Sequence, residues 1–216
     1  HPRLRQRMIR PPGFAGAAFG TTASGDSRSD AVRRAAISDE LGIPADWAFV
    51  HQVHGTRVLE AIVPGSLGDA DAIFTAAGNV PIAVATADCV PVIIEASTAV
   101  SVIHAGWRGA AAGVVMAALE YMIARGHEPQ RAAIGPAIGP CCYEVGPEVT
   151  ARFVGHVAQT TWGTASIDIP GFIEQQLAGL EVWRSGECTY TSERLHSYRR
   201  DGTRQRQVAV AWLPTS

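Results

Sequence analysis

The chain has 216 residues, of which 47% are hydrophobic and 18% are charged, and its formal net charge is −2. This length suits one domain with one substantial core, so we predict a single domain over residues 1–216. A nearly neutral chain offers no field that attracts nucleic acid, and no segment approaches the run of about 20 apolar residues that spans a membrane. We therefore expect neither nucleic acid nor a membrane as a partner.

The cysteines and the N-terminus set the expected compartment and domain start. Two of the cysteines, Cys141 and Cys142, are adjacent, which is unlike the spaced cysteines of a secreted disulfide scaffold. We expect reduced thiols and a cytoplasmic protein, either monomer or homodimer. The first methionine is Met8, so we treat residues 1–7 as upstream sequence with no structural role.

Helical signals come first along the chain, followed by residues typical of strands. Asp30 or Ser29 can cap a helix that Gly42 ends and that Pro44 prevents from continuing. Residues 47–63 are rich in β-branched and aromatic side chains, which predicts one or two strands interrupted near Gly55.

Apolar runs without alternation fill the middle of the chain. Such runs predict strands that are buried on both faces, inside a layered fold. The predicted strands are 72–75, 81–87, 90–96 and 99–105. Residues 106–126 then predict an alanine-rich helix of about five turns that ends at Gly126.

The C-terminal part mixes loops with short elements. Residues 134–149 form an apolar loop punctuated by glycine and proline. A helix is predicted from Asp168 to a cap at Gly179, and the last apolar run, near the C-terminus, predicts a strand.

Two histidines in the first strand region are candidate ligands. On a strand, His51 and His54 would point to opposite faces, so we expect only one of them at a given site. Gly55 allows close approach of the backbone next to His54, which favours His54.

Cys89 and His104 each end an apolar run, and three interpretations compete for them: a metal site, a cysteine–histidine nucleophile pair, or ordinary buried residues. A catalytic zinc site uses nitrogen and sulfur ligands with an open position, which His54, Cys89 and His104 match. Asp88 alternates in direction with Cys89, so we expect it to orient a histidine or to hold a loop.

The residues after His104 suggest an anion pocket. Gly106 and Gly109 flank Trp107 and Arg108 at the start of a predicted helix, where free backbone N–H groups and the guanidinium suit phosphate. Alternatively, the glycines permit close packing of strand and helix.

Several motifs resemble one known family. QVHG at 52–55, TADCVPV at 86–92, HAGWRG at 104–109, IGPAIGPCCYEVG at 134–146 and SYRRDG at 197–202 are similar to the YfiH-type proteins, also labelled laccase-domain or multicopper polyphenol oxidase proteins. The resemblance implies an α+β fold with two mixed β-sheets between helical layers (α/β/β/α).

The same resemblance implies an enzyme. It maps zinc ligands onto His54, Cys89 and His104, and it implies phosphate-dependent cleavage of adenosine, inosine, guanosine and methylthioadenosine, together with adenosine deamination. Purine nucleosides and phosphate are the expected partners, and copper is a candidate substitute for zinc. The candidate catalytic residues are Cys89, Asp88 and Arg108, and the candidate substrate or phosphate residues are Gly106, Trp107, Gly109, Cys141 and Tyr143.

Two rival functions remain open, and one is disfavoured. A cysteine hydrolase would use Cys89 as nucleophile and His104 or His54 as base, acting on an amide such as a cell-wall precursor. A non-catalytic binding protein would keep the zinc scaffold but lack activity. The N-terminal segment has Ala23 where relatives carry an arginine that helps to bind substrate, and this change could remove turnover. A copper laccase is disfavoured, since the chain has seven histidines and no His-x-His motif.

Overall fold

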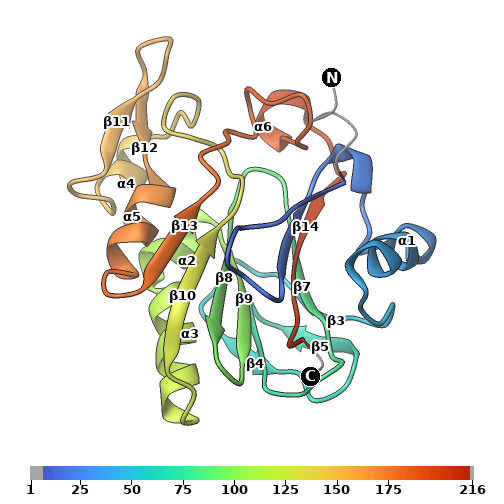
Figure 1. Ribbon diagram of the computed structural model, residues 1–216. Coiled ribbons are helices and arrows are strands. Elements are labelled where there is room, and N and C mark those ends of the chain that lie inside the picture. The colour runs from blue at the N-terminus through green and yellow to red at the C-terminus, as the bar shows by residue number, and fades with distance from the viewer. Residues whose placement is uncertain (1–6, 215–216) are drawn as a thin grey trace.

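Strands buried on both faces form the centre of the fold. The computed structural model describes residues 7–214, and Figure 1 shows its sheets between helices. The first sheet has six strands in the order β1 (Met8–Ile9), β2 (Ala17–Gly20), β14 (Gln207–Ala211), β7 (Ile82–Thr86), β3 (Ala48–His51) and β5 (Gly65–Asp69). The second sheet has six in the order β13 (Glu181–Arg184), β10 (Pro129–Ile134), β8 (Val90–Ala96), β9 (Val100–Ala105), β6 (Ala72–Thr75) and β4 (Val58–Glu60). A separate pair joins β11 (Val157–Gln159) to β12 (Ala165–Ile167).

Side chains of β8 show why its apolar run does not alternate. Ile93 packs between the two sheets, whereas Val92 and Ile94 pack against the helices on the other side. Strand β7 is also buried on both faces, with Val84 between the sheets and Ala85 on the outer side. The strands predicted from continuous apolar runs are therefore confirmed. Strands β7 and β8 each contribute side chains to two hydrophobic cores.

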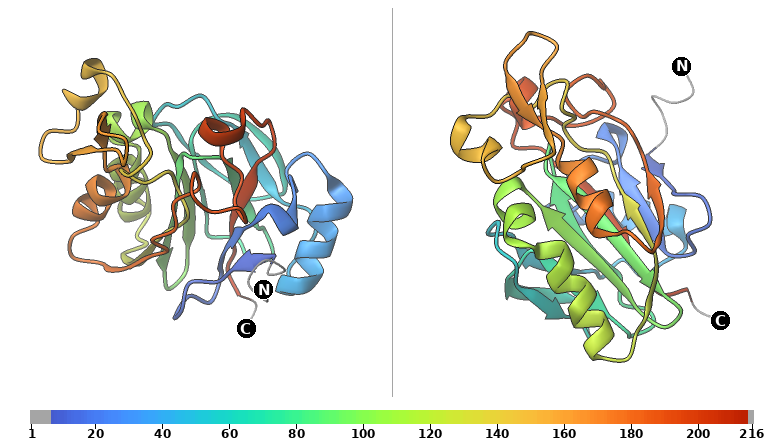
Figure 2. Two further views of the ribbon diagram at one scale, coloured as in Figure 1. Left: turned by 90° about the horizontal axis from the view of Figure 1, so that it is seen from above. Right: turned by 90° about the vertical axis from the view of Figure 1, so that its left-hand side faces the viewer.

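Helices cover the outer face of each sheet, as the two views of Figure 2 show. Helix α1 lies on the first sheet, and α2, α3 and α5 lie on the second. The predicted α+β arrangement, with two mixed sheets between helical layers, is confirmed. The helices are α1 (Ala31–Leu41), α2 (Trp107–Ala112), α3 (Val114–Ala124), α4 (Pro147–Thr150), α5 (Ile169–Gln176) and α6 (Tyr198–Asp201), with a short 3-10 turn at Thr22–Ser24.

Capping residues end the helices largely where the sequence predicts. Asp30 caps α1 by accepting from the N–H groups of Val32 and Arg33, and Gly42 ends it with a φ of 69°. Asp168 caps the start of α5 in the same way, accepting from the Gly171 N–H, but the helix ends at Gln176, before the predicted cap at Gly179.

The predicted helix over 106–126 is wrong in its continuity. The helix over 106–126 divides into α2 and α3 at Gly113, whose φ of 92° only glycine adopts without strain. The strand region 47–63 contains two strands with an interruption around Gly55, as predicted, and β3 belongs to the first sheet whereas β4 belongs to the second. The loop between them therefore crosses from sheet to sheet.

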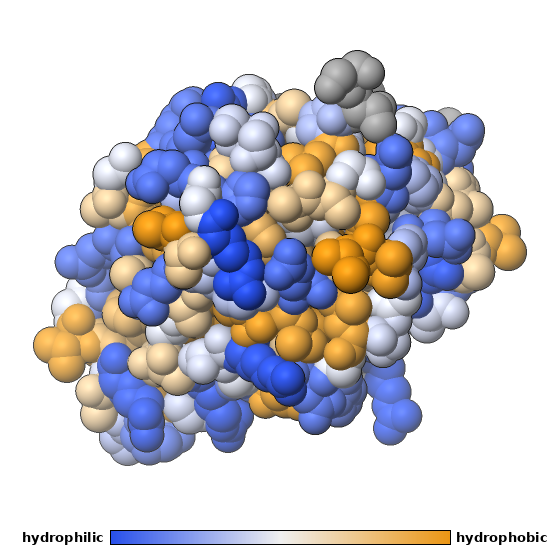
Figure 3. All heavy atoms as spheres, turned by 90° about the horizontal axis from the view of Figure 1, so that it is seen from below, coloured by the Kyte–Doolittle hydropathy of each residue, from blue (hydrophilic) through white to orange (hydrophobic). Residues whose placement is uncertain are grey.

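The N-terminal end of the described chain pairs with the fold at Arg7. Residues 1–6 of the segment treated as upstream lie outside the described residues, but Arg7 belongs to the fold because its carbonyl accepts from the Thr21 N–H at 3.0 Å. Among residues 7–214, no helix is long and apolar enough to cross a bilayer. Figure 3 shows one face, on which hydrophobic groups are bordered by hydrophilic ones. The expected monomer or homodimer stays a prediction.

Packing at Gly135 gives a test of the contact between the sheets. A Cβ at this position would overlap the Phe19 ring and lie 2.9 Å from Cγ of Pro91. Gly135→Ala should therefore lower the free energy of unfolding by about 1–3 kcal/mol in urea titrations. Gly78→Ala is the matched control, because no atom lies within 4 Å of its Cβ, and it should change stability by less than about 0.5 kcal/mol. Equal effects would contradict the tight packing at Gly135.

Candidate functional site

The candidate site forms where the chain passes from the first sheet to the second. Strands β3, β5 and β7 of the first sheet are each followed by a strand of the second sheet. We call the connecting segments 52–57, 70–71 and 87–89 the crossover loops. They carry His54, Asp71 and Cys89, and His104 pairs with Pro91 at the adjacent end of β9. The topology thus brings these side chains to one edge of the sheets.

Asp71 is the buried centre of this edge. Its side chain is fully buried and accepts hydrogen bonds from Nδ1 of His104 at 2.8 Å and from the N–H groups of His54 at 2.9 Å and Gly55 at 2.6 Å. The N–H of Val53 donates to it at 3.2 Å. One carboxylate therefore fixes both the first crossover loop and the orientation of the His104 ring.

The hydrogen bonds to Asp71 decide its charge. Burial raises the pKa of the carboxyl, but hydrogen bonds from His104 and from the Gly55 backbone outweigh burial and hold the pKa below its ordinary value. Asp71 is therefore ionised at neutral pH. Because it holds Nδ1 of His104, the other ring nitrogen, Nε2, is left for a ligand.

His54 lies in a loop, which corrects the expectation that it lies on a strand. Its backbone has a φ of 62°, an unusual conformation for a residue other than glycine, and the hydrogen bonds to Asp71 hold it there. His51 ends β3 and pairs with Asp69 at 2.8 Å on the surface. The two histidines do point to different places, because of the loop rather than strand alternation.

His54, Cys89 and His104 form what we call the donor cluster. Their ligand atoms lie within 4.8 Å of one another, and Nε2 of His54 is 3.9 Å from Sγ of Cys89. The rings of His54 and His104 meet edge to face, with centroids 4.8 Å apart. Two imidazoles and one thiol, of which His54 and Cys89 line a cavity, are a donor set that suits a transition metal with an open coordination position.

Both glycines of the GWRG turn pack against the His54 loop. A Cβ at Gly106 would lie 2.6 Å from Cδ2 of His54 and 3.2 Å from Sγ of Cys89. A Cβ at Gly109 would lie 2.9 Å from the Gly55 carbonyl oxygen. Close packing is therefore the role that the contacts support for these glycines, and α2 begins beside the donor cluster because of it.

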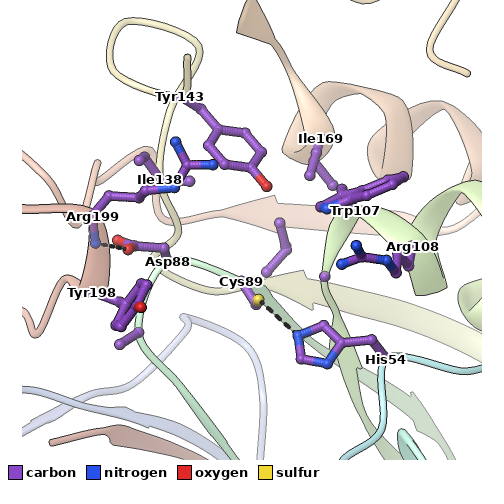
Figure 4. A pocket seen from close by; sticks show the side chains of 13 residues that line it. His54, Asp88, Cys89, Trp107, Arg108, Ile138, Tyr143, Ile169, Tyr198 and Arg199 are labelled. Carbon is purple, nitrogen blue, oxygen red and sulfur yellow. Dashed lines mark hydrogen bonds between the residues drawn. The ribbon is translucent and has the colours of Figure 1, made fainter. Parts of the chain in front are cut away.

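A cavity of about 150 Å³ opens beside the donor cluster, and we call it the site cavity (Figure 4). Trp107 and Arg108 form one wall, and Tyr143 and Arg199 form the other. The lining is His54, Ala87, Asp88, Cys89, Val90, Gly106, Trp107, Arg108, Ile138, Tyr143, Ile169, Tyr198 and Arg199. A wider groove of about 540 Å³ shares four of these residues: Trp107, Arg108, Tyr143 and Arg199.

Asp88 holds loops together at the rim of the site cavity. Its carboxylate accepts from Oγ1 of Thr189 at 2.6 Å and from the Arg199 N–H at 2.7 Å. Its carbonyl accepts from the Ile138 N–H at 2.9 Å. Of the two roles expected for Asp88, the structure shows the loop contacts, while Asp71 orients the histidine.

The pKa values around Cys89 follow from these neighbours. Burial raises the pKa of the Cys89 thiol, but His104 and His54 outweigh burial and lower it to about 6. Burial lowers the pKa of His104, but Asp71 and Cys89 together raise it to about 9. Without a metal ion, the cluster is therefore a thiolate beside an imidazolium at neutral pH.

Some predicted residues lie elsewhere, and others escaped prediction. Cys141 lines a different cavity, so the structure does not bring it to the site cavity. Asp71 was missed because its short local sequence gives no sign of the partners it meets. Arg199 and Tyr198 belong to the SYRRDG motif, which was the available signal for them.

The Asp71 interaction gives the first test of the site. Asp71→Asn replaces one acceptor oxygen with an amide, which repels the N–H groups of the His54 loop. We expect the affinity for Zn²⁺ to fall by about 10- to 100-fold in a titration against a competing chelator. Asp69→Asn is the matched control, because Asp69 also pairs with a histidine but on the surface. Unchanged affinity in Asp71→Asn would contradict the orienting role.

The lowered pKa of Cys89 gives a second test. In the metal-free protein, alkylation by iodoacetamide requires the thiolate, so labelling of Cys89 should rise with pH around a midpoint near 6. Peptide mass spectrometry after short exposures at each pH measures it. A midpoint at the ordinary thiol value of about 8.5 would contradict the stabilisation by the histidines.

Comparison with known proteins places the chain among its relatives. A Streptomyces griseus protein named purine nucleoside phosphorylase is 39% identical over 213 residues, covering 90% of this chain and 86% of that protein. A Deinococcus radiodurans protein of the same name is 37% identical over 204 residues, covering 88% of this chain and 80% of that protein.

Solved structures and a family model also match nearly the whole chain. A DUF152 protein of Neisseria meningitidis has a TM-score of 0.83 at 27% identity, covering 97% of this chain and 100% of that one. YlmD from Geobacillus stearothermophilus also has a TM-score of 0.83, at 26% identity, covering 98% of this chain and 99% of that one. Residues 4–214 match the family described as multi-copper polyphenol oxidoreductase laccase. The chain therefore belongs to this laccase-like family, which includes the YfiH-type proteins that its motifs resemble.

Proposed function

We propose that this protein is a zinc-dependent purine nucleoside phosphorylase that acts on adenosine, inosine, guanosine or methylthioadenosine. The observation that carries the proposal is the donor cluster at one end of a cavity whose walls hold Arg108 and Arg199. The names of the relatives from Streptomyces griseus and Deinococcus radiodurans support the reaction class. Free thiols at all four cysteines suit the reducing cytoplasm as its compartment.

The residues of the donor cluster fit zinc. Two imidazole nitrogens and one sulfur would hold it, and Asp71 would keep the His104 ring in orientation. When bound, zinc supplies a Lewis acid at the inner end of the cavity. Laccase chemistry is not part of the proposal, because the sequence lacks the paired His-x-His motifs of a copper cluster.

Phosphorolysis breaks the bond between C1′ of the ribose and the purine nitrogen and forms a bond from C1′ to a phosphate oxygen, while the proton that the hydrogen phosphate loses ends on the base. The guanidinium groups of Arg108 and Arg199 line the site cavity and can hold the phosphate. Positioning phosphate against C1′ is the main task of such a site, since it makes the attack effectively unimolecular.

Tyr143 is placed to donate a hydrogen bond to the substrate. Figure 4 shows its hydroxyl pointing into the site cavity. Burial, together with the charge of Cys89, raises the pKa of Tyr143 to about 12, so the hydroxyl keeps its proton at neutral pH. It can therefore donate to the departing base or to a ribose hydroxyl.

The two hollows divide the substrate between them. A volume of about 150 Å³ in the site cavity is small for a whole nucleoside, whereas the adjoining groove of about 540 Å³ has room for the remainder. Trp107 and Tyr143 lie where the hollows meet, so we place the reacting bond between them.

A second candidate, a cysteine hydrolase, is favoured by one observation. Cys89 has a lowered pKa of about 6, and Asp71, His104 and Cys89 form an acid–base–nucleophile chain. Metal analysis separates the two candidates, because near-stoichiometric zinc that disappears in Cys89→Ala excludes a free thiolate nucleophile. A non-catalytic binding protein, the third possibility, would bind adenosine or inosine without turnover.

The experiment that tests the function uses purified protein with adenosine, inosine, guanosine and methylthioadenosine, with and without phosphate. Mass detection follows free base, sugar phosphate and deaminated product. We expect free base and sugar phosphate only when phosphate is present. Formation of inosine from adenosine would reveal a deaminase activity in addition. Absence of any product under every condition contradicts the proposal.

The phosphate role of Arg108 gives a further prediction. Arg108→Gln removes a charge-assisted contact, so kcat/KM for phosphate should fall by about 10- to 100-fold. Steady-state kinetics at varied phosphate concentration measures this. Arg125→Gln is the matched control, because Arg125 pairs with Glu60 away from the site cavity and should leave the kinetics unchanged. A phosphate dependence that is unaltered in Arg108→Gln would overturn the assignment.

A further inference from the structure

The cysteines outside the donor cluster come together at a second place. Cys141 and Cys142 lie in the loop after β10, and Cys188 reaches them through a bridge that pairs it with Ala137. Their sulfur atoms lie within 4.8 Å of one another, and those of Cys141 and Cys142 are 3.1 Å apart. We call these residues the thiol cluster.

The thiol cluster has its own cavity. Cys141 and Cys188 are half-buried and line a hollow of about 250 Å³ with Gly139, Pro140 and other residues. Cys142 is 4% exposed and lines the wider groove beside the site cavity. None of the residues lining this hollow lines the site cavity. An ion can therefore reach the sulfurs of Cys141 and Cys188 without passing the donor cluster.

The distances suit one ion bound by all three sulfurs. With metal–sulfur bonds of about 2.3 Å, sulfurs around a three-coordinate ion lie about 4 Å apart, and a short adjustment of the sulfur positions gives that geometry. The Gly139 N–H already donates to Sγ of Cys188 at 3.2 Å, a contact that stabilises a thiolate there.

Simple packing does not need this arrangement. Cys142 belongs to the hydrophobic core on the outer side of the second sheet, and Cys141 and Cys188 pack against it, so packing accounts for part of their burial. Packing alone does not require that thiols from two distant segments meet one another beside a hollow. All of them are free thiols in the structure, so no disulfide accounts for their proximity.

We propose that the thiol cluster binds one Cu⁺ ion through Cys141, Cys142 and Cys188, at a site separate from the donor cluster. Thiolates select soft cations such as Cu⁺, and each thiol gives its proton to solvent as the ion binds. Zinc in a structural site takes four ligands, and among residues 7–214 no fourth histidine, cysteine or carboxylate atom lies within 4.8 Å of all three sulfurs. Glu187 lines the same hollow, but its carboxylate is paired with Arg194.

Occupancy of the thiol cluster would also reach the wall of the site cavity. Tyr143 directly follows Cys142, and Thr189 directly follows Cys188 and donates to Asp88 at 2.6 Å. Tyr143 thus lines the site cavity, and Thr189 binds Asp88, which also lines it. A bound ion would cross-link the two segments that carry them.

The test is a titration of the full chain with Cu⁺, without oxygen and with a phosphine reductant, against a chelator that competes for Cu⁺. The Cys89→Ser protein removes the sulfur of the donor cluster and isolates the thiol cluster. We expect it to bind one equivalent with an ultraviolet thiolate-to-copper absorption band. Adding Cys188→Ser or Cys141→Ser to this protein should abolish the band and weaken binding by at least 100-fold.

A matched control separates this site from the donor cluster and from loss of fold. Cys188→Ser with Cys89 intact should keep zinc at the donor cluster and keep the melting temperature of the parent. The proposal is overturned if the Cys89→Ser protein and its Cys188→Ser derivative bind Cu⁺ equally. It is also overturned if the thiol cluster takes one Zn²⁺ in preference to Cu⁺. Neither result bears on the proposed phosphorylase activity, which is measured with nucleosides.

Discussion

The carboxylate of Asp71 is the interaction on which the candidate site depends. It is fully buried and ionised, and it is satisfied by hydrogen bonds from the first crossover loop and from His104. A buried charge that loses its partners costs several kcal/mol, so the fold keeps these groups in place. The crossover loops, which come from separate parts of the sequence, therefore meet at one point and hold His54 and His104 in fixed orientations.

The charges of the cluster residues shift one another's pKa values. Asp71 and Cys89 together raise the pKa of His104 to about 9, and His104 and His54 together lower that of Cys89 to about 6. An incoming cation must displace the proton on His104, so metal binding strengthens as the pH rises toward 9. The same chain would activate Cys89 as a nucleophile in the absence of metal, which is why the two candidate functions share one geometry.

Much of the fold could be predicted from the sequence because its signals are local. Strand 90–96 is continuous and apolar since it is buried on both faces, and the caps Asp30 and Gly42 mark both ends of α1. The failures are tertiary. Gly113 looks like a helix residue until its positive φ is seen, and nothing between 47 and 63 shows that its two strands belong to different sheets.

The same distinction applies to the site. His54, Cys89 and His104 are residue types with metal chemistry at the ends of apolar runs, so the sequence favours them, and the structure brings them together. Asp71 is an ordinary acidic residue in sequence, and its role exists only after the loops converge. Cys141 looked like part of the pocket because its loop is, but its side chain points to the thiol cluster.

X-ray absorption at the zinc edge of the purified protein reports which atoms surround the metal, and so whether the donor cluster holds it. We expect one zinc per chain, bound by one sulfur and two imidazole nitrogens, and loss of that signal in His54→Ala. A zinc ion surrounded by three sulfurs, or a protein that binds no zinc at the donor cluster, would contradict it.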